Sequence, residues 1–399
     1  MKIIKREKYL DRLIGLKNTP DIKIITGIRR SGKSELLKEY IKYIKNIEKD
    51  SNIIYLDMQD LKNEKFLDFR VLNDYINDNY KKSVNNYLFI DEVQLCKNFE
   101  KTINSIHSKK TFDIYLTGSN AFLMSSDLAT LFTGRAIEIE VFPFSFKEFY
   151  EYFDEKNIDE AFLDYINIGG MSGAYVYKTE EDRKAYLKNI YETILLRDLV
   201  QRNDIRDINL LEKISDFMMS NISNLTSFRK IADVLTNNKQ NINHKTVSEY
   251  ISHMCEAFLL YKTNRYDIQG KSYLSTIEKY YLVDHGFRYS ILGKKNMDYG
   301  RIYENIIAIE LYRRGYEVYV GKLYQKEIDF VAVKDSEKIY IQVSDNISNE
   351  KTLDRELSPL LQIRDAYPKI LIANTKNPMT LMDGVKVYDI ARWLLGYES

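Results

Sequence analysis

The chain has 399 residues, enough for two or three domains, and its 44% of hydrophobic residues is ordinary for a protein with a buried core. Its 59 Lys and Arg residues almost cancel its 58 Asp and Glu residues, so any contact with nucleic acid needs a local basic patch. Two distant cysteines outside any C-x-x-C pattern argue against a zinc site and favour a reducing, cytoplasmic compartment, and no apolar run is long enough to span a membrane.

The first predicted elements are an amphipathic helix within residues 1–16 and a strand, loop and helix that begin at residue 22. Residues 22–34 read IKIITGIRRSGKS, a β-branched run followed by the spacing G-x-x-x-x-G-K-S. Glycines let backbone N–H groups curl around a phosphate, and the next helix adds the positive end of its dipole. A glycine turn before an amphipathic helix is the alternative, but the strand-loop-helix context favours binding of a nucleoside triphosphate such as ATP.

A second motif completes the predicted nucleotide site. Lys33 would reach the β- and γ-phosphates, and the Ser34 hydroxyl would bind Mg²⁺. The apolar strand 87–90 ends in Asp91, expected to hold Mg²⁺, and Glu92, expected to orient the attacking water, a pairing that favours a hydrolase over a nucleotide kinase. The residues expected to bind ATP are Gly27, Ile28, Arg29, Arg30, Ser31, Gly32, Lys33 and Ser34.

Two further residues are candidates for contact with the γ-phosphate. The strand 112–116 runs into Thr-Gly-Ser-Asn, where Asn120 is the first choice for a γ-phosphate sensor and Ser119 the second; an Asn in a turn is the alternative. Arg135 precedes the alternating strand 136–141, which we expect at the margin of the sheet. It could reach its own site or that of a neighbouring subunit in a homo-oligomer, or it could be a solvated arginine.

Five strands alternating with helices predict a parallel, three-layer α/β sandwich of the P-loop NTPase class in residues 1–150. The segments GIRRSGKS, YLFIDEVQ, LTGSN and TGR, followed by VFPFSFKEF, resemble the prokaryotic AAA-type ATPases that carry a C-terminal domain of unknown function. The resemblance extends over almost the whole chain. It implies ATP and Mg²⁺ as ligands and says little about biological role.

The middle of the chain, residues 151–292, is predicted to be a helical linker followed by a winged-helix module. Residues 210–266 predict three helices and a wing, the arrangement in which the second helix of a helix-turn-helix enters the major groove of DNA. Acidic residues on the exposed face weaken the DNA prediction, and a protein-contact or lid module is the alternative. The candidate phosphate-binding residues are Arg229, Lys230, Lys245, Lys262 and Arg265.

The last part, residues 293–399, is predicted to be a small α/β domain similar to the PD-(D/E)xK nucleases, in which acidic side chains hold Mg²⁺ and a lysine helps to activate water. The candidate metal-binding residues are Glu304, Glu327, Asp329 and Gln342. The sequence departs from the nuclease pattern because the expected E-x-K is Gln-Val-Ser at 342–344, which removes a charged ligand and the lysine. A degenerate fold used for binding or assembly is therefore favoured over an active nuclease.

Three functional hypotheses follow from these motifs. The first is an ATP-hydrolysing switch or motor that could act on DNA. The second is an ATP-dependent DNA nuclease, and the third is a nucleotide-gated scaffold or DNA-binding regulator with little turnover. The triphosphate chemistry is well specified by residues 22–34 and 87–92, whereas the output of the C-terminal half is not.

Overall fold

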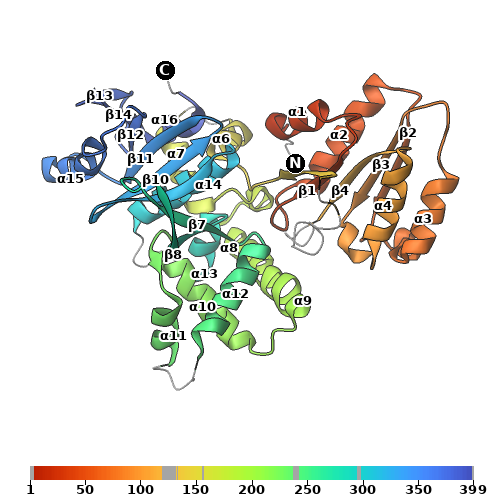
Figure 1. Cartoon of the computed structure of the whole chain (residues 1–399), viewed down its shortest axis with the longest axis horizontal. Helices are drawn as coiled ribbons and strands as arrows, with labels where there is room; N and C mark the ends of the chain where they lie inside the picture. The colour runs from red at the N-terminus through yellow and green to blue at the C-terminus, as the bar shows by residue number, and fades with distance from the viewer. Residues whose placement is uncertain are drawn as a thin grey trace. The chain divides into compact units, whose positions relative to one another are not determined.

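The computed structural model describes residues 4–118, 132, 134–154, 157–236, 242–293 and 298–397. The chain forms two compact units (Figure 1), an N-terminal unit made mainly of residues up to Pro143 and a C-terminal unit made mainly of residues from Phe144 onward. Within the described ranges, no helix is both long and apolar enough to cross a membrane.

The N-terminal unit contains a five-stranded sheet in the order β2-β3-β4-β1-β5. Every strand pair in it is parallel, and β5 lies at an edge, so the predicted P-loop NTPase architecture is confirmed. The strands are β1 (Ile22–Thr26), β2 (Asn52–Asp57), β3 (Asn86–Asp91), β4 (Asp113–Thr117) and β5 (Ala136–Glu140).

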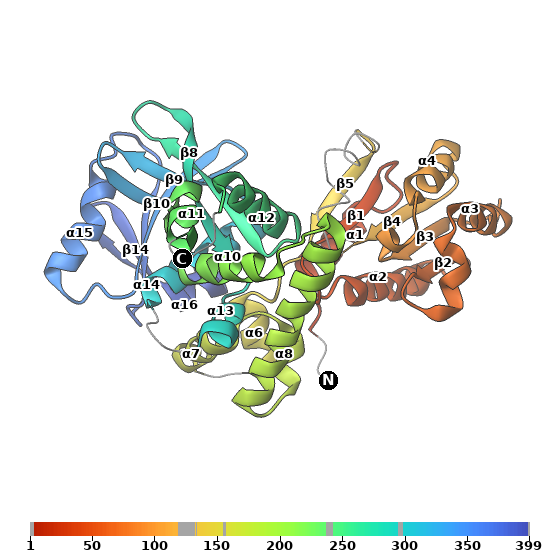
Figure 2. The same cartoon turned by 90° about the horizontal axis from the view of Figure 1, so that it is seen from below.

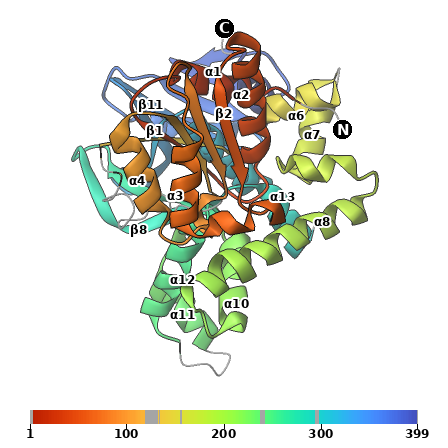
Figure 3. The ribbon, with the colours of Figure 1, turned by 90° about the vertical axis from the view of Figure 1, so that its right-hand side faces the viewer.

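Helices cover both faces of this sheet, as Figure 3 shows. Because side chains alternate along a strand, Leu88 and Ile90 of β3 pack on one face, and Tyr87 and Phe89 pack on the other. One face is covered by α3 (Phe69–Asp78) and α4 (Phe99–Lys109), and the other by α1 (Glu7–Gly15) and α2 (Lys33–Ile47). The three layers bury the strands and leave the strand ends available for a site.

The C-terminal unit begins with a run of helices. The helix that starts with α8 continues through a π-helical stretch at Ile194–Val200. The elements are α6 (Phe146–Phe153), α7 (Ile158–Ile168), a 3₁₀ turn (Ser172–Val176), α8 (Glu180–Thr193) and α9 (Gln201–Asn203).

Three helices and a hairpin follow, in the order expected for residues 210–266 (Figure 2). In the third of these helices Val247, Ile251 and Met254 are buried on one face. The winged-helix assignment and its DNA contacts stay predictions. The elements are α10 (Ile208–Ser220), β6 (Leu225–Thr226), α11 (Phe228–Thr236), α12 (His244–Glu256), β7 (Leu260–Asp267) and β8 (Ser272–Leu282).

The remaining elements complete a nine-stranded mixed sheet in the order β13-β14-β12-β11-β10-β9-β7-β8-β6. The order of helix, three antiparallel strands, helix and strand matches the elements predicted from residue 301 onward, but the nuclease-like resemblance stays a prediction. The elements are α13 (His285–Leu292), α14 (Tyr299–Arg313), β9 (Glu317–Leu323), β10 (Lys326–Lys334), β11 (Glu337–Ser344), α15 (Glu350–Leu361), β12 (Lys369–Ala373), β13 (Thr380–Met382), β14 (Val385–Asp389) and α16 (Ile390–Leu395).

The nine-stranded sheet contains strands from both sides of residue 293, where the sequence predicted a domain boundary. Strand β7 pairs in parallel with β9, so the hairpin of the middle segment and the strands of the last segment belong to one sheet. At this junction Tyr266 pairs with Gly321, where an added Cβ would lie 2.8 Å from the Cβ of Ile328. The parallel pairing joins residues more than 50 positions apart, and no local pattern in the sequence predicts it.

Candidate functional site

The phosphate loop follows β1, and its two glycines adopt conformations that other residues disfavour. Gly27 has φ of +128°, and an added Cβ would lie only 2.2 Å from the carbonyl oxygen of Val141. Gly32 has φ of +99° and caps the N-terminus of α2. Both positions therefore require glycine, and the loop leads directly into the positive end of α2.

Lys33 and its neighbours line this loop. The Lys33 side chain is buried, and its Nζ donates to the carbonyl oxygens of Gly27 at 2.8 Å and Ile28 at 2.9 Å. Ser34 lies half-buried in the first turn of α2. The Oγ atom of Ser31 is buried, and it has no hydrogen-bond partner in the described part of the chain. A buried hydroxyl without a partner inside a loop of this shape fits a ligand that brings its own acceptor oxygens, as a phosphate does.

Arg6, which sequence reasoning missed, holds the phosphate loop from outside. Its Nη1 donates to the carbonyl oxygen of Ser31 at 3.0 Å and to that of Phe142 at 2.9 Å. The guanidinium lies 4.5 Å from the ring centroid of Tyr9, and the residue is 5% exposed. Arg6 therefore ties the loop to the segment that leaves the sheet after β5. A single arginine before a helix carries no sequence signal for this role.

The acidic pair lies at the same edge of the sheet as the phosphate loop. Asp91 is the last residue of β3, and Thr117 is the last residue of β4, which lies between β3 and β1. The Thr117 hydroxyl donates to Asp91 Oδ1 and accepts from the Glu92 backbone N–H at 3.0 Å. Because neighbouring strands are about 4.8 Å apart, the acidic pair lies roughly 10 Å from the loop across the sheet.

Glu92 has an unusual backbone and a partner of its own. Its φ of +56° is in the left-handed region, which a residue with a Cβ adopts only when its surroundings hold it there. The Nε2 atom of Gln94 donates to Glu92 Oε2 at 2.5 Å. Thr117 and Gln94 were not predicted, although Thr117 directly ends the strand beside the acidic pair and its position could have indicated it.

The two predicted γ-phosphate contacts have different outcomes. Asn120, with its alternative Ser119, lies outside the described residues. Arg135 is exposed, and its carbonyl oxygen accepts from the backbone N–H of Ile22, at the start of β1, at 2.7 Å. Because all strands of this sheet are parallel, the start of β1 lies on the side of the sheet opposite to the phosphate loop, which follows the end of β1. Arg135 is therefore not brought to the site of its own unit.

In the C-terminal unit, the structure gathers three of the four predicted metal ligands around a lysine. Lys279 Nζ, on β8, lies 2.8 Å from Glu304 Oε1, 2.7 Å from Glu327 Oε1 and 3.9 Å from Asp329 Oδ1. We call these four residues the acidic cluster. Among the residues that the structure describes, no group of three or more His, Cys, Asp or Glu side chains is arranged to hold a metal ion.

Gln342 lies beside the acidic cluster, and both ends of its amide are in use. Its Oε1 accepts from the Asp329 backbone N–H at 3.3 Å, and its Nε2 donates to Glu356 Oε2 at 3.0 Å. The backbone N–H of Val343 donates to Asp329 Oδ2 at 2.8 Å. Gln342 thus braces β10 against β11 and α15, where the sequence suggested a weak metal ligand.

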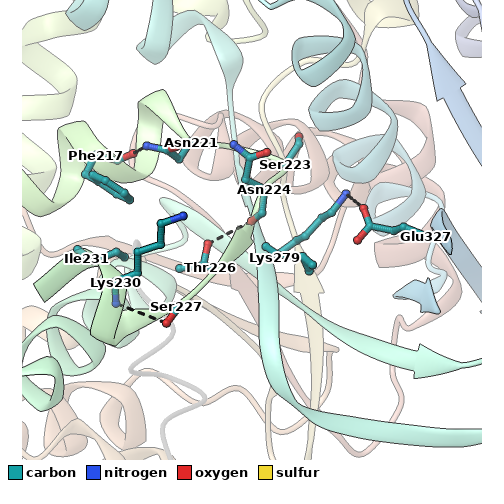
Figure 4. A pocket seen from close by; sticks show the side chains of 11 residues that line it. Phe217, Asn221, Ser223, Asn224, Thr226, Ser227, Lys230, Ile231, Lys279 and Glu327 are labelled. Carbon is teal, nitrogen blue, oxygen red and sulfur yellow. Dashed lines mark hydrogen bonds and ion pairs between the residues drawn. The ribbon is translucent and has the colours of Figure 1, made fainter. Parts of the chain in front are cut away.

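A pocket of about 440 Å³ opens beside the acidic cluster (Figure 4). Lys230 of α11 points into it from one side, and the Lys279–Glu327 ion pair lies at the other. Of the basic residues predicted to contact DNA, Arg229, Lys230, Lys245 and Lys262 are exposed. Lys262 is paired with Glu278 at 2.9 Å, and Arg265 is half-buried.

Comparison with known proteins places the chain in a family. A family model described as an AAA domain matches residues 19–150, and another, described as a domain of unknown function, matches residues 159–298. An uncharacterized protein of Haemophilus influenzae is 39% identical over 402 residues, covering 98% of this chain and 99% of that relative. The chain belongs to the AAA-type P-loop ATPases that carry a C-terminal domain of unknown function.

A second relative and a solved structure are also similar to this chain, at lower sequence identity. An uncharacterized protein of Methanocaldococcus jannaschii is 30% identical over 379 residues, covering 90% of this chain and 82% of the relative. The structure of AMPPCP-bound DnaA from Aquifex aeolicus covers 64% of this chain and 90% of that chain at 18% identity, with a TM-score of 0.35. A likeness at that level carries no argument about function.

Proposed function

We propose that this AAA-type protein binds ATP with Mg²⁺ and hydrolyses it to drive a conformational switch. The observation that carries the proposal is the Thr117 hydroxyl, which joins Asp91 and Glu92 at the edge of the sheet that also carries the phosphate loop. A structural turn would need neither the loop glycines nor a buried acidic residue at that edge. The arrangement fits phosphoryl transfer to water, in which catalysis consists of positioning and electrostatic stabilisation.

Each residue has a definite task in this proposal. The loop N–H groups and Lys33 would bind the β- and γ-phosphates, exchanging the two loop carbonyls that Lys33 contacts for phosphate oxygens. Ser34 and Asp91 would hold Mg²⁺, which neutralises phosphate charge when bound. Glu92 would orient the attacking water and accept its proton. Gln94, which donates to Glu92 Oε2, would hold that carboxylate in place.

Two substitutions test the proposal. Glu92→Gln keeps the size of the side chain and removes its basicity, so ATP should still bind while turnover falls by about 100-fold or more. Lys33→Ala should weaken ATP binding itself, because it removes the positive charge in the loop. Turnover would be measured with Mg²⁺, with and without DNA, and affinity with a fluorescent ATP analogue. The proposal fails if the unaltered protein hydrolyses no ATP, or if Glu92→Gln turns over as fast as the parent.

The same measurement addresses assembly. Arg135 lies away from the site of its own unit, so a role at a γ-phosphate would require a second copy of the chain. If it acts in this way, turnover per molecule should rise with protein concentration, and Arg135→Ala should abolish that rise. Turnover that is independent of concentration in both proteins would make Arg135 a solvated arginine.

A second candidate function, nucleotide-dependent DNA binding, is favoured by the exposed basic residues on α11 and α12. Lys230 and Lys245 are exposed on these two helices of the three-helix segment. Affinity for duplex DNA should then fall with salt, and a Lys230→Ala, Lys245→Ala double variant should bind more weakly with a shallower salt dependence. A difference between ADP and a non-hydrolysable ATP analogue would link this binding to the switch. Lack of binding at low salt would leave the scaffold alternative.

A further inference from the structure

The acidic cluster of the C-terminal unit is closed by a group from outside the predicted nuclease-like segment. Glu304 comes from α14, Glu327 and Asp329 from β10, and Lys279 from the hairpin strand β8. The Lys279 side chain is 4% exposed, and the side chain of Glu327 is 33% exposed where it lines the pocket of Figure 4. One ammonium group therefore contacts two carboxylates and lies near a third, in a mostly buried place.

The carboxyl groups of the acidic cluster favour the charged form of Lys279 by their proximity. Burial by itself would lower the pKa of Lys279, but the carboxylates of Glu304, Asp329 and Glu327 raise it above its usual range. Burial raises the pKa of Glu304, and burial together with the charge of Glu304 raises the pKa of Asp329. The cluster is thus a set of carboxyl groups whose excess negative charge is offset by a single internal cation.

Several polar groups beside the acidic cluster have hydrogen-bond partners of their own. The Tyr281 hydroxyl, which is fully buried, donates to Glu304 Oε1 at 2.7 Å. Asp329 Oδ2 accepts from the backbone of Val343, and Gln342 is bonded at both ends of its amide. A buried ion-pair network is stable only when its remaining donors and acceptors find partners, and these hydrogen bonds supply such partners from within the chain.

We infer that Lys279 is the built-in cation of the acidic cluster, lying where a divalent metal ion would otherwise bind, and that the cluster fastens strand β8 to α14 and β10. The cluster thus serves as an ion-pair latch between the hairpin and the sheet, and metal-dependent cleavage of nucleic acid is not a function of this unit. The inference is independent of the proposed ATP hydrolysis, since it concerns only residues of the C-terminal unit.

A divalent-ion titration of the full-length protein without nucleotide tests this inference. Every protein in this titration carries Asp91→Asn, so that Mn²⁺ bound at the predicted Mg²⁺ site of the N-terminal unit does not affect the melting temperature. With Lys279 present, MnCl₂ should leave the melting temperature unchanged. Lys279→Met should lower the melting temperature by about 10 °C, because it leaves buried carboxylates without their cation. It should also create an increase in melting temperature with MnCl₂ that adding Glu304→Gln reduces.

Two results would overturn the latch. One is a MnCl₂-dependent stabilisation of the chain that retains Lys279, lost on Asp329→Asn. The other is Mn²⁺-dependent cleavage of plasmid DNA by the unaltered protein that Asp329→Asn abolishes. Both measurements use the native lysine, so they decide the question even if Lys279→Met does not fold. A plasmid left intact, together with an unchanged melting temperature, supports the latch.

Discussion

The two units use their clustered acidic residues in opposite ways. In the N-terminal unit, Asp91 and Glu92 lie beside a loop of glycines with a buried hydroxyl that lacks a partner among the described residues. In the C-terminal unit, the carboxylates of Glu304 and Glu327 are paired with Lys279. The first arrangement leaves charge and hydrogen-bonding capacity for a ligand, and the second uses them internally. Clustered acidic residues therefore indicate a ligand site only when their partners are known.

The largest expected effect tests the phosphate loop. Gly27→Ala should destabilise the N-terminal unit by about 3 kcal/mol or more and abolish ATP binding, because the new Cβ would meet the Val141 carbonyl and φ is positive. Gly15→Ala is the matched control, since nothing lies within 4 Å of its Cβ position, and it should be close to neutral. Urea unfolding gives the stability of each variant, and titration with a fluorescent ATP analogue gives its affinity for ATP. Equal stability of the two variants would contradict the tight packing of the loop.

The next effect tests the link between Asp91 and Glu92. Thr117→Val keeps the shape of the side chain and removes the hydroxyl that bonds both residues, so ATP turnover should fall by about 10- to 100-fold. Thr117→Ser, which keeps the hydroxyl, should retain most of the activity. Steady-state turnover under saturating ATP is the measurement. If Thr117→Val and Thr117→Ser hydrolyse ATP at the same rate, the hydroxyl does not position the acidic pair.

A smaller effect is expected for the support of the loop. Arg6→Met removes two hydrogen bonds to carbonyl oxygens, which are worth about 1 to 3 kcal/mol when a charged donor makes them, and ATP affinity should fall by about 10-fold. Arg12→Met, at an exposed position of α1, is the control. Titration with a fluorescent ATP analogue compares them. An unchanged affinity for Arg6→Met would show that the loop keeps its shape without this contact.

The smallest effect concerns pH and the C-terminal unit. Burial and Glu304 raise the pKa of Asp329, so this carboxyl binds a proton more tightly in the folded chain than in the unfolded chain. Its contribution to stability is complete below the unfolded pKa of about 4 and is lost as the pH rises through the folded pKa. Asp329→Asn cannot lose a proton. From about pH 5 to pH 8, the parent should therefore lose about 1 kcal/mol or more of unfolding free energy relative to the variant.

Urea unfolding at several pH values measures this difference. Asp335→Asn is the control and should follow the parent, because Asp335 is exposed in the turn between β10 and β11. A pH dependence that is the same for Asp329→Asn and the parent would mean that Asp329 is ionised in both the folded and unfolded chains.

The sequence predicted much of the N-terminal unit because its signals are local. The spacing of Gly27, Gly32, Lys33 and Ser34 encodes a loop and a helix start within eight residues, and alternating apolar residues mark the strands. The parallel sheet follows because strands separated by helices return in the same direction. The edge position of β5 was predicted from its polar alternation. These features depend on φ, periodicity and connection length, all of which can be read along the chain.

Only the tertiary structure decided which distant groups meet. Arg6 reaches the carbonyl oxygen of residue 142, and Lys279 reaches Glu304 and Glu327 from a strand assigned to another part of the chain. Such contacts depend on strand order and register, which no local spacing encodes. The sequence therefore determined a phosphate loop and its acidic partners, and the fold decided that the second group of acidic residues holds a lysine. The physical reason is that a buried charge is stabilised by whichever opposite charge the packing brings to it.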